Sequence, residues 1–182
     1  MGQRKNIVDL LKRDHARMRA RLDLLDSVPL SQLVAYFADL RDEIDRHETA
    51  EEIVVYPVFL GSVPDGAEIA DACIAEHSDI ESTLDRLDVA SPELHEFRDK
   101  LRSLRATILR HTEHEETAVL PGLTAFVGGP ERSALAAAYG EVRRAPPERK
   151  SASGSGGLPA DVVRGRFVSP SDDPGDATRK GA

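Results

Sequence analysis

Two copies of one short pattern constrain the fold of this chain more than any other feature. Each copy has a glutamate four residues after a histidine and a proline ten residues after it; the copies are His47, Glu51 and Pro57, then His111, Glu115 and Pro121. Residues four apart project from the same face of an α-helix. That face is otherwise apolar over several turns in both copies, so each histidine–glutamate pair is predicted to point into a helical core.

The composition favours an all-α fold. Charged residues make up 31% of the chain and aromatic residues 4%, and strand-like runs of β-branched residues are absent from the sequence. Apolar stripes predict four long helices, at about 6–26, 31–56, 67–88 and 91–120, and a short fifth helix at about 130–144. Because the connections are short, we expect an antiparallel, up-down-up-down four-helix bundle.

Capping residues and prolines predict the ends of these helices. The expected N-caps are Asn6, Ser31 and Ser91. Pro57 disfavours helical geometry in the residue before it, so the second helix is expected to end near Tyr56. A loop is expected from Gly61 to Gly66.

The chain divides into two predicted parts. Residues 1–144 contain all the helical stripes and form one domain. Residues 145–182 contain paired prolines and a Ser/Gly-rich run at 151–157, with little apolar content. These features predict a disordered C-terminal tail.

Charge and cysteine content restrict the partners and the compartment. The net charge of −8 argues against nucleic acid as the main partner. The single cysteine excludes an internal disulfide and favours a reducing compartment. No apolar run reaches membrane-spanning length, so we expect a cytoplasmic protein without a membrane partner.

Each of the four long stripes contains a histidine where a leucine would be expected: His15, His47, His77 and His111. Together with Glu51 and Glu115 they suit iron, manganese or zinc. Six ligands are too many for one tetrahedral zinc ion. They suit two metal ions that share both carboxylates and have two histidines each. The alternative is a metal-free bundle with a few hydrogen-bonded polar groups in its core.

Tyr56 allows two interpretations. Nine residues at about 100° each place it about 180° from His47 on an ideal helix, so it should face away from the site. Pro57 can distort this turn and swing the phenol inward, where it would lie next to a metal or bind it. Leu120 is its counterpart in the second copy, so the site would be asymmetric there.

Other polar residues near the stripes allow less specific predictions. Cys73 could reach a metal, but a buried apolar cysteine is the better interpretation. Four acids lie beside stripe residues: Asp14, Glu52, Glu76 and Glu116. Glu52 and Glu116 are interpreted as solvated rather than as partners of the histidines, and for Asp14 and Glu76 both roles remain open. His95 and His114 fall off the stripes and are assigned to the surface.

The stripe residues resemble the motifs of the hemerythrin-like family, the HHE cation-binding domains. The matching residues, within about 5–127, are His15, His47-x-x-x-Glu51 with Tyr56-Pro57, His77, and His111-x-x-x-Glu115 with Leu120-Pro121. The resemblance implies a non-haem di-iron centre, with two iron ions joined by an oxo or hydroxo bridge and by two carboxylates. Manganese and zinc are less favoured.

The chain departs from the oxygen-carrying members of that family at two places. Those members have His-x-x-x-His on the third helix, where this chain has Cys73, and His-x-x-x-x-Asp on the fourth, where it has Glu115 at a shorter spacing. The missing fifth histidine argues against reversible oxygen carriage. Ferritin-like di-iron bundles use Glu-x-x-His instead, which this sequence lacks.

The pattern is similar to that of actinobacterial hemerythrin-like proteins associated with peroxide breakdown, and of iron- and oxygen-sensing domains. It implies catalase-like breakdown of hydrogen peroxide, with Tyr56 as the one candidate catalytic residue, delivering a proton. The alternative is a non-enzymatic module that senses oxygen, nitric oxide or iron, or that stores iron. The expected partner is in each case a small molecule or a metal ion.

Overall fold

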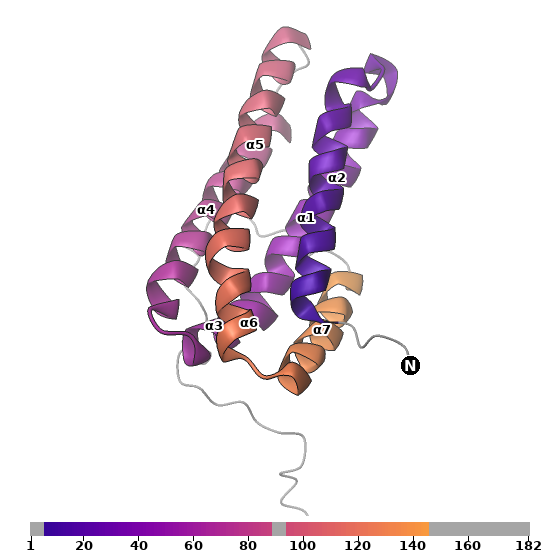
Figure 1. Ribbon diagram of the computed structural model, residues 1–182. Coiled ribbons are helices and arrows are strands. Elements are labelled where there is room, and N and C mark those ends of the chain that lie inside the picture. The colour runs from indigo at the N-terminus through magenta and orange to yellow at the C-terminus, as the bar shows by residue number, and fades with distance from the viewer. Residues whose placement is uncertain (1–5, 89–93, 146–182) are drawn as a thin grey trace, which may run out of the picture.

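Four long helices run side by side along the molecule (Figure 1). They are α1 (Ile7–Leu24), α2 (Leu30–Ala50), α4 (Gly66–Asp88) and α5 (Leu94–His114). The computed structural model describes residues 6–88 and 94–145, and within these ranges it contains helices and no strand. The predicted all-α helical bundle is confirmed.

The second and fourth predicted helices continue through their prolines. After α2, residues Glu51–Val55 form one π-helical turn that leads into α3 (Tyr56–Ser62). After α5, residues Glu115–Val119 form a second π-helical turn that leads into α6 (Leu120–Phe126). The prediction of a helix end near Tyr56 is therefore wrong. A proline in a regular α-helix clashes with the carbonyl four residues earlier, and the wider π turn accommodates it.

The predicted helix starts are correct only in part. Asn6 caps α1, because its side-chain oxygen accepts a hydrogen bond of 3.1 Å from the backbone N–H two residues later. Ser31 does not cap α2, since the helix begins one residue earlier with Pro29 at the N-cap position. The predicted loop at 61–66 shrinks to a short turn in which Asp65 adopts a φ of 58°.

Apolar side chains form two clusters, with the histidine layer between them. Along α1, Ile7 and Leu11 belong to one cluster and Met18 and Leu22 to the other, and His15 lies between the two pairs. Burial of both clusters provides the main driving force for folding. It also surrounds the polar layer with apolar walls.

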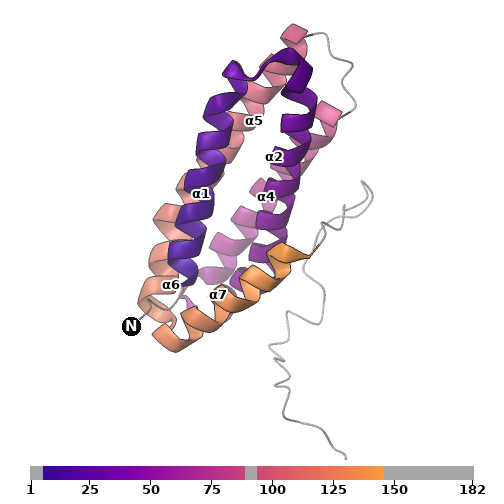
Figure 2. The same cartoon turned by 90° about the vertical axis from the view of Figure 1, so that its right-hand side faces the viewer.

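The fifth predicted helix is α7 (Gly129–Arg144), which runs obliquely across one end of the bundle and contacts α1 and α2 (Figure 2). It buries Leu135, Ala136 and Tyr139 in the cluster that also contains Phe59. The apolar face of this amphipathic helix thus covers one end of the bundle.

The predicted cap at Ser91 and residues 146–182 of the predicted tail lie outside the described residues. In the part of the chain that is described, no helix is both long and apolar enough to cross a membrane.

Candidate metal centre

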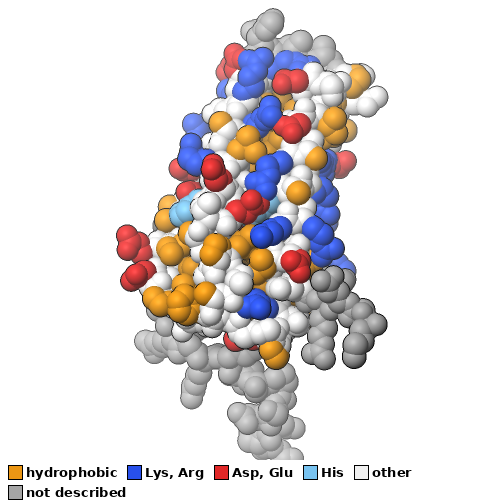
Figure 3. Space-filling view, in the orientation of Figure 1, with side chains coloured by type: hydrophobic (Ala, Val, Ile, Leu, Met, Phe, Trp, Pro, Cys, Tyr) orange, Lys and Arg blue, Asp and Glu red, His pale blue; other side chains and the backbone are white. Residues whose placement is uncertain are grey.

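Six buried polar side chains meet in the middle of the bundle. They are the six candidates from the sequence: His15, His47, Glu51, His77, His111 and Glu115. None is more than 3% exposed. The face of the molecule in Figure 3 accordingly shows interspersed acidic and basic side chains and little histidine.

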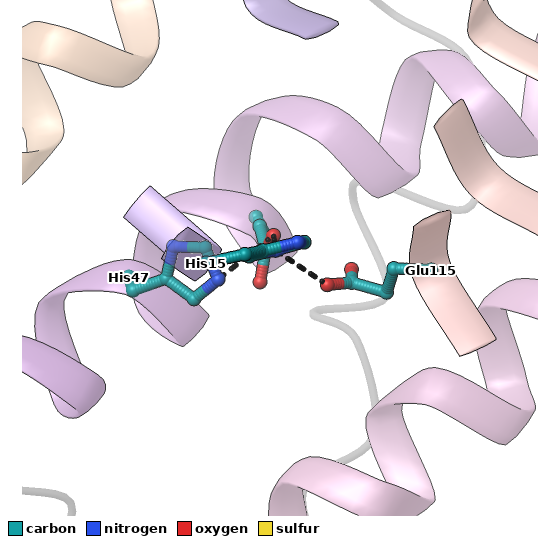
Figure 4. Close-up of side chains that lie close together, drawn as sticks. His15, His47 and Glu115 are labelled. Carbon is teal, nitrogen blue, oxygen red and sulfur yellow. Dashed lines mark ion pairs between the residues drawn. The ribbon is translucent and has the colours of Figure 1, made fainter. Parts of the chain in front are cut away.

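The six side chains form two groups that share both glutamates. One group is His15, His47, Glu51 and Glu115, and the other is Glu51, His77, His111 and Glu115. Within the first, Nε2 of His15 lies 3.1 Å from Oε2 of Glu115 (Figure 4). Nε2 of His47 lies 3.2 Å from Oε1 of Glu51. Ligands about 2.1 Å from one metal ion lie about 3 Å from each other, so each group has the spacing of a cation site.

Three of the four imidazoles are held from outside by a carboxylate. The Nδ1 atoms of His15, His77 and His111 lie 3.0, 3.1 and 2.9 Å from oxygens of Glu116, Glu52 and Glu76. Such contacts keep the proton on Nδ1 and leave Nε2 facing the site. Glu52 and Glu116 are therefore partners of the histidines, contrary to the preferred interpretation, and Glu76 orients an imidazole on the neighbouring helix.

His47 is held by a tyrosine instead. Its Nδ1 lies 2.6 Å from the hydroxyl of Tyr139, a buried residue of α7. The Tyr139 hydroxyl donates a hydrogen bond of 3.0 Å to Asp14, which places Asp14 behind His47 rather than beside its sequence neighbour His15. Sequence reasoning missed Tyr139. Its position four residues after Leu135 marks it as a buried residue of α7, but no spacing shows which histidine it reaches.

The inward-facing atoms have the donor character that a metal ion requires. Among the described residues, Nε2 of His15 and His47, both oxygens of Glu51 and Oε2 of Glu115 are buried without a hydrogen-bond partner. Such groups are costly to bury unless something compensates them. Divalent cations bound by imidazole and carboxylate would compensate all of them, so the residues present fit a two-metal centre.

Opposing pKa shifts show how the metal-free site balances its charge. Burial lowers the pKa of His15, but its contacts with Glu115 and Glu51 outweigh burial and raise the pKa to about 10. Burial lowers the pKa of His47 to about 4. Burial opposes ionisation of Glu51, yet the facing histidines hold the pKa of this carboxyl well below its usual range. Protons thus occupy positions from which bound metal ions would displace them.

Tyr56 points into the site. Its hydroxyl donates a hydrogen bond of 2.8 Å to Oε1 of Glu115 and lies 3.3 Å from Nε2 of His77. The expectation from an ideal α-helix, that Tyr56 faces away from the site, is wrong. The π-helical turn contains one extra residue, which rotates the following turn back by about 100°. Burial raises the pKa of Tyr56 well above its usual range, so the phenol is a hydrogen-bond donor in the metal-free protein.

Cys73 belongs to a separate group. The thiol is buried, as the preferred interpretation stated, and its Sγ lies 3.9 Å from Nδ1 of His114. That nitrogen lies 3.1 Å from Glu76, and the three residues lie close enough together to hold a cation of their own. The His114 side chain is 31% exposed, so it lies at the edge of the bundle, as its assignment to the surface predicts, but its ring also contacts Glu76. The side chain of His95 lies outside the described residues.

A helical bundle with two buried His–Glu groups that share their carboxylates defines a metal-binding helical domain. Residues 6–123 match the hemerythrin HHE cation-binding domain, and the chain belongs to this family. An uncharacterized hemerythrin-like protein of Schizosaccharomyces pombe is 28% identical over 133 residues, which cover 71% of this chain and 64% of that protein. A Nostoc protein described as a DNA nickase is 28% identical over 125 residues, or 66% of this chain and 34% of that protein.

The chain thus spans about a third of one of these relatives and just under two thirds of the other. No solved structure matches the chain.

Proposed function

We propose that this domain is a non-haem di-iron protein that breaks down hydrogen peroxide. The observation that carries the proposal is the pair of four-residue groups joined by Glu51 and Glu115. In this proposal His15 and His47 would hold one iron ion, His77 and His111 would hold the other, and Glu51 and Glu115 would serve both. Manganese or zinc would fit the same donors but is less favoured in this proposal, and zinc does not change its oxidation state.

Two histidines and two shared carboxylates per metal ion leave room for a small molecule. Two bound iron ions would supply the redox chemistry for converting two peroxide molecules into O₂ and two water molecules, with two electrons and two protons passing from one peroxide to the other. The protein would supply ligands and a buried pocket whose apolar walls limit access of water. These walls come from the two clusters above and below the histidine layer.

Tyr56 is the chain's own candidate for handling a proton or binding a metal ion. Its hydroxyl donates its proton to Glu115, 2.8 Å away, and lies 3.3 Å from Nε2 of His77, in the second four-residue group. The corresponding residue of the second repeat is Leu120, a buried apolar side chain. One side of the proposed centre therefore has a phenol that the other side lacks.

Measurement of bound iron and of O₂ release from hydrogen peroxide by the purified, iron-loaded chain tests the proposal. We expect two iron ions per chain and sustained O₂ release. Glu51→Ala and Glu115→Ala should each lose two-metal occupancy because both groups share these residues, whereas His114→Ala should retain it. Two bound iron ions without O₂ release would support the alternative, a module that senses oxygen, nitric oxide or iron or that stores iron.

We do not extend the description of the Nostoc relative as a DNA nickase to this chain. The alignment spans only 34% of that protein, and the net charge of −8 opposes binding to a phosphate backbone. We propose a small-molecule ligand and a cytoplasmic location, in keeping with the single cysteine.

A further inference from the structure

A chain of buried polar contacts connects the candidate centre to α7. It runs from Nδ1 of His47 to the hydroxyl of Tyr139, 2.6 Å away, and from there to Oδ2 of Asp14 at 3.0 Å. The carboxylate of Asp14 also accepts hydrogen bonds from the guanidinium groups of Arg143 and Arg17. Tyr139 and Arg143 both belong to α7, which lies beyond the residues that match the family.

The positions of the protons in this series of hydrogen bonds follow from Asp14 at its outer end. Asp14, which receives two guanidinium groups, acts as an acceptor, so the single hydroxyl proton of Tyr139 points toward Asp14. The oxygen of Tyr139 can then only accept a hydrogen bond from His47. A His47 ring that donates from Nδ1 to this oxygen, 2.6 Å away, has no proton on Nε2 in its neutral form.

This arrangement prepares Nε2 of His47 for a cation. The unprotonated Nε2 lies 3.2 Å from Oε1 of Glu51, with neither atom donating to the other. Two lone pairs facing each other in a buried site are unfavourable without a positive charge between them. His47 adopts the Nδ1–H form without a carboxylate in direct contact with its ring. The hydroxyl of Tyr139 lies between them, and its proton is directed by Asp14.

The two groups of the centre therefore differ in their support. His77 and His111 both have carboxylate partners, Glu52 in the π-helical turn after α2 and Glu76 on α4. His47 depends on a hydroxyl group from α7. A carboxylate partner makes an imidazole more basic than a phenol does, so the two metal positions should bind cations with different strength.

We propose that Tyr139 is a positioning residue that fixes the Nδ1–H form of His47, and that the metal position at His15 and His47 consequently depends on α7. The second half of this proposal rests on the two-metal centre proposed above. The first half concerns the metal-free chain and stands independently of it.

The first test is ¹⁵N NMR of the histidine rings in the metal-free protein. We expect wild-type His47 to carry its proton on Nδ1. In Tyr139→Phe, Nδ1–H loses its acceptor while Glu51 can still accept from Nε2, so the Nε2–H form should become populated. A wild-type His47 in the Nε2–H form, or a tautomer that Tyr139→Phe leaves unchanged, would overturn the role of Tyr139.

The second test is competition between the protein and a chelator for Zn²⁺. It measures separately the affinities of the first and the second Zn²⁺ ion bound per chain. Loss of a partner behind a ligating histidine lowers metal affinity by about 10- to 100-fold. We expect this loss in Tyr139→Phe for one equivalent only, and a selective loss in the same equivalent for Asp14→Asn. Equal weakening of both equivalents would indicate a general packing role and would overturn the proposal.

Tyr36→Phe is the matched control. The Tyr36 hydroxyl donates a hydrogen bond of 2.8 Å to the backbone oxygen of Arg21, away from the site, so its removal should change neither the His47 tautomer nor Zn²⁺ retention. A similar effect in both variants would contradict a specific role for Tyr139. Failure of the wild-type chain to bind two Zn²⁺ ions would refute the two-metal centre, whereas the metal-free tautomer decides the role of Tyr139 by itself.

Discussion

At the scale of single residues, three of the four candidate histidines are each fixed by a carboxylate that is less buried than the imidazole it contacts. Glu52, Glu76 and Glu116 lie at the edge of the bundle, with 20 to 30% of each side chain exposed. From there their carboxylates reach inward to imidazoles that are no more than 3% exposed. A carboxylate at the edge can remain hydrated while it orients a buried ring, which lowers the free-energy cost of placing charge near the core.

Tyr56 is the residue whose role can be tested most directly. Its hydroxyl lies as close to Glu115 and His77 as ligands of one metal ion lie to each other. We expect the oxidised, iron-loaded protein to show a visible phenolate-to-iron absorption band. Tyr56→Phe should abolish this band without lowering the iron content by more than a small fraction, and Tyr36→Phe should retain it.

A spectrum that Tyr56→Phe does not change would remove Tyr56 from the metal ligands. The phenol would then act only through its hydrogen bond to Glu115, and the six-residue site would stand without it.

The sequence predicted the residues of the site better than it predicted their partners. His15 and His47 could be found because a histidine in an otherwise apolar stripe faces the core, where it requires a polar partner or a metal ion. Glu116 could not, because a glutamate beside a stripe looks the same whether it is hydrated or turned inward. Tyr139 could not, because its contact with His47 depends on the angle at which α7 crosses the bundle.

At the scale of elements, the two π-helical turns determine the shape of the site. They occur at equivalent positions of the repeat, each begins at a candidate bridging glutamate, and each leads into a short helix with a proline at its second residue. Sequence periodicity assumes an unbroken α-helix, so it placed Tyr56 on the wrong face. Proline indicated a disturbance at this position, but a helix end and a widened turn are equally compatible with it.

The short helices that follow the π turns pack tightly against each other, and this contact gives a stability prediction. A Cβ atom added to Gly122 of α6 would lie 2.7 Å from Cε2 of Phe59 in α3, a ring that is fully buried. Gly122→Ala should therefore lower the free energy of unfolding by about 1–3 kcal/mol, as overpacked sites do. Denaturant titration of the chelated protein measures this change.

Gly61→Ala is the control in the same region, since no atom lies within 4 Å of the added Cβ. This substitution should leave stability unchanged or raise it by about 0.5–1 kcal/mol through the higher helix propensity of alanine. Destabilisation by both substitutions to the same extent would argue against the packing explanation.

At the scale of the whole molecule, α7 is attached to the bundle both by apolar packing and by the contact of Tyr139 with His47. Truncation after Arg144 keeps Tyr139 and removes only residues with little apolar content, so fold and metal content should remain intact. Truncation after Val127 removes Tyr139 together with buried Leu135 and Ala136. We expect the shorter chain to retain metal less well and to unfold at a lower temperature, as measured by metal analysis and thermal denaturation.

Loss of iron in the chain that ends at Arg144 would show that residues after α7 contribute to the site. Equal properties of both truncated chains would show that α7 is dispensable.

Removal of metal should destabilise the whole fold. Without cations, Glu51 and Glu115 remain buried opposite four imidazoles, and several of these atoms have no hydrogen-bond partner among the described residues. A ligand that binds only the native state stabilises it by about 2.7 kcal/mol per site when its free concentration is a hundred times Kd. For two sites in a chain of this size, this corresponds to a decrease in melting temperature of roughly 10 °C or more after chelation. Scanning calorimetry with and without chelator measures this difference in melting temperature. A chain with both Glu51→Ala and Glu115→Ala should show no difference between the two conditions. Equal melting temperatures for the wild-type chain in both conditions would exclude a metal centre in the core of the bundle.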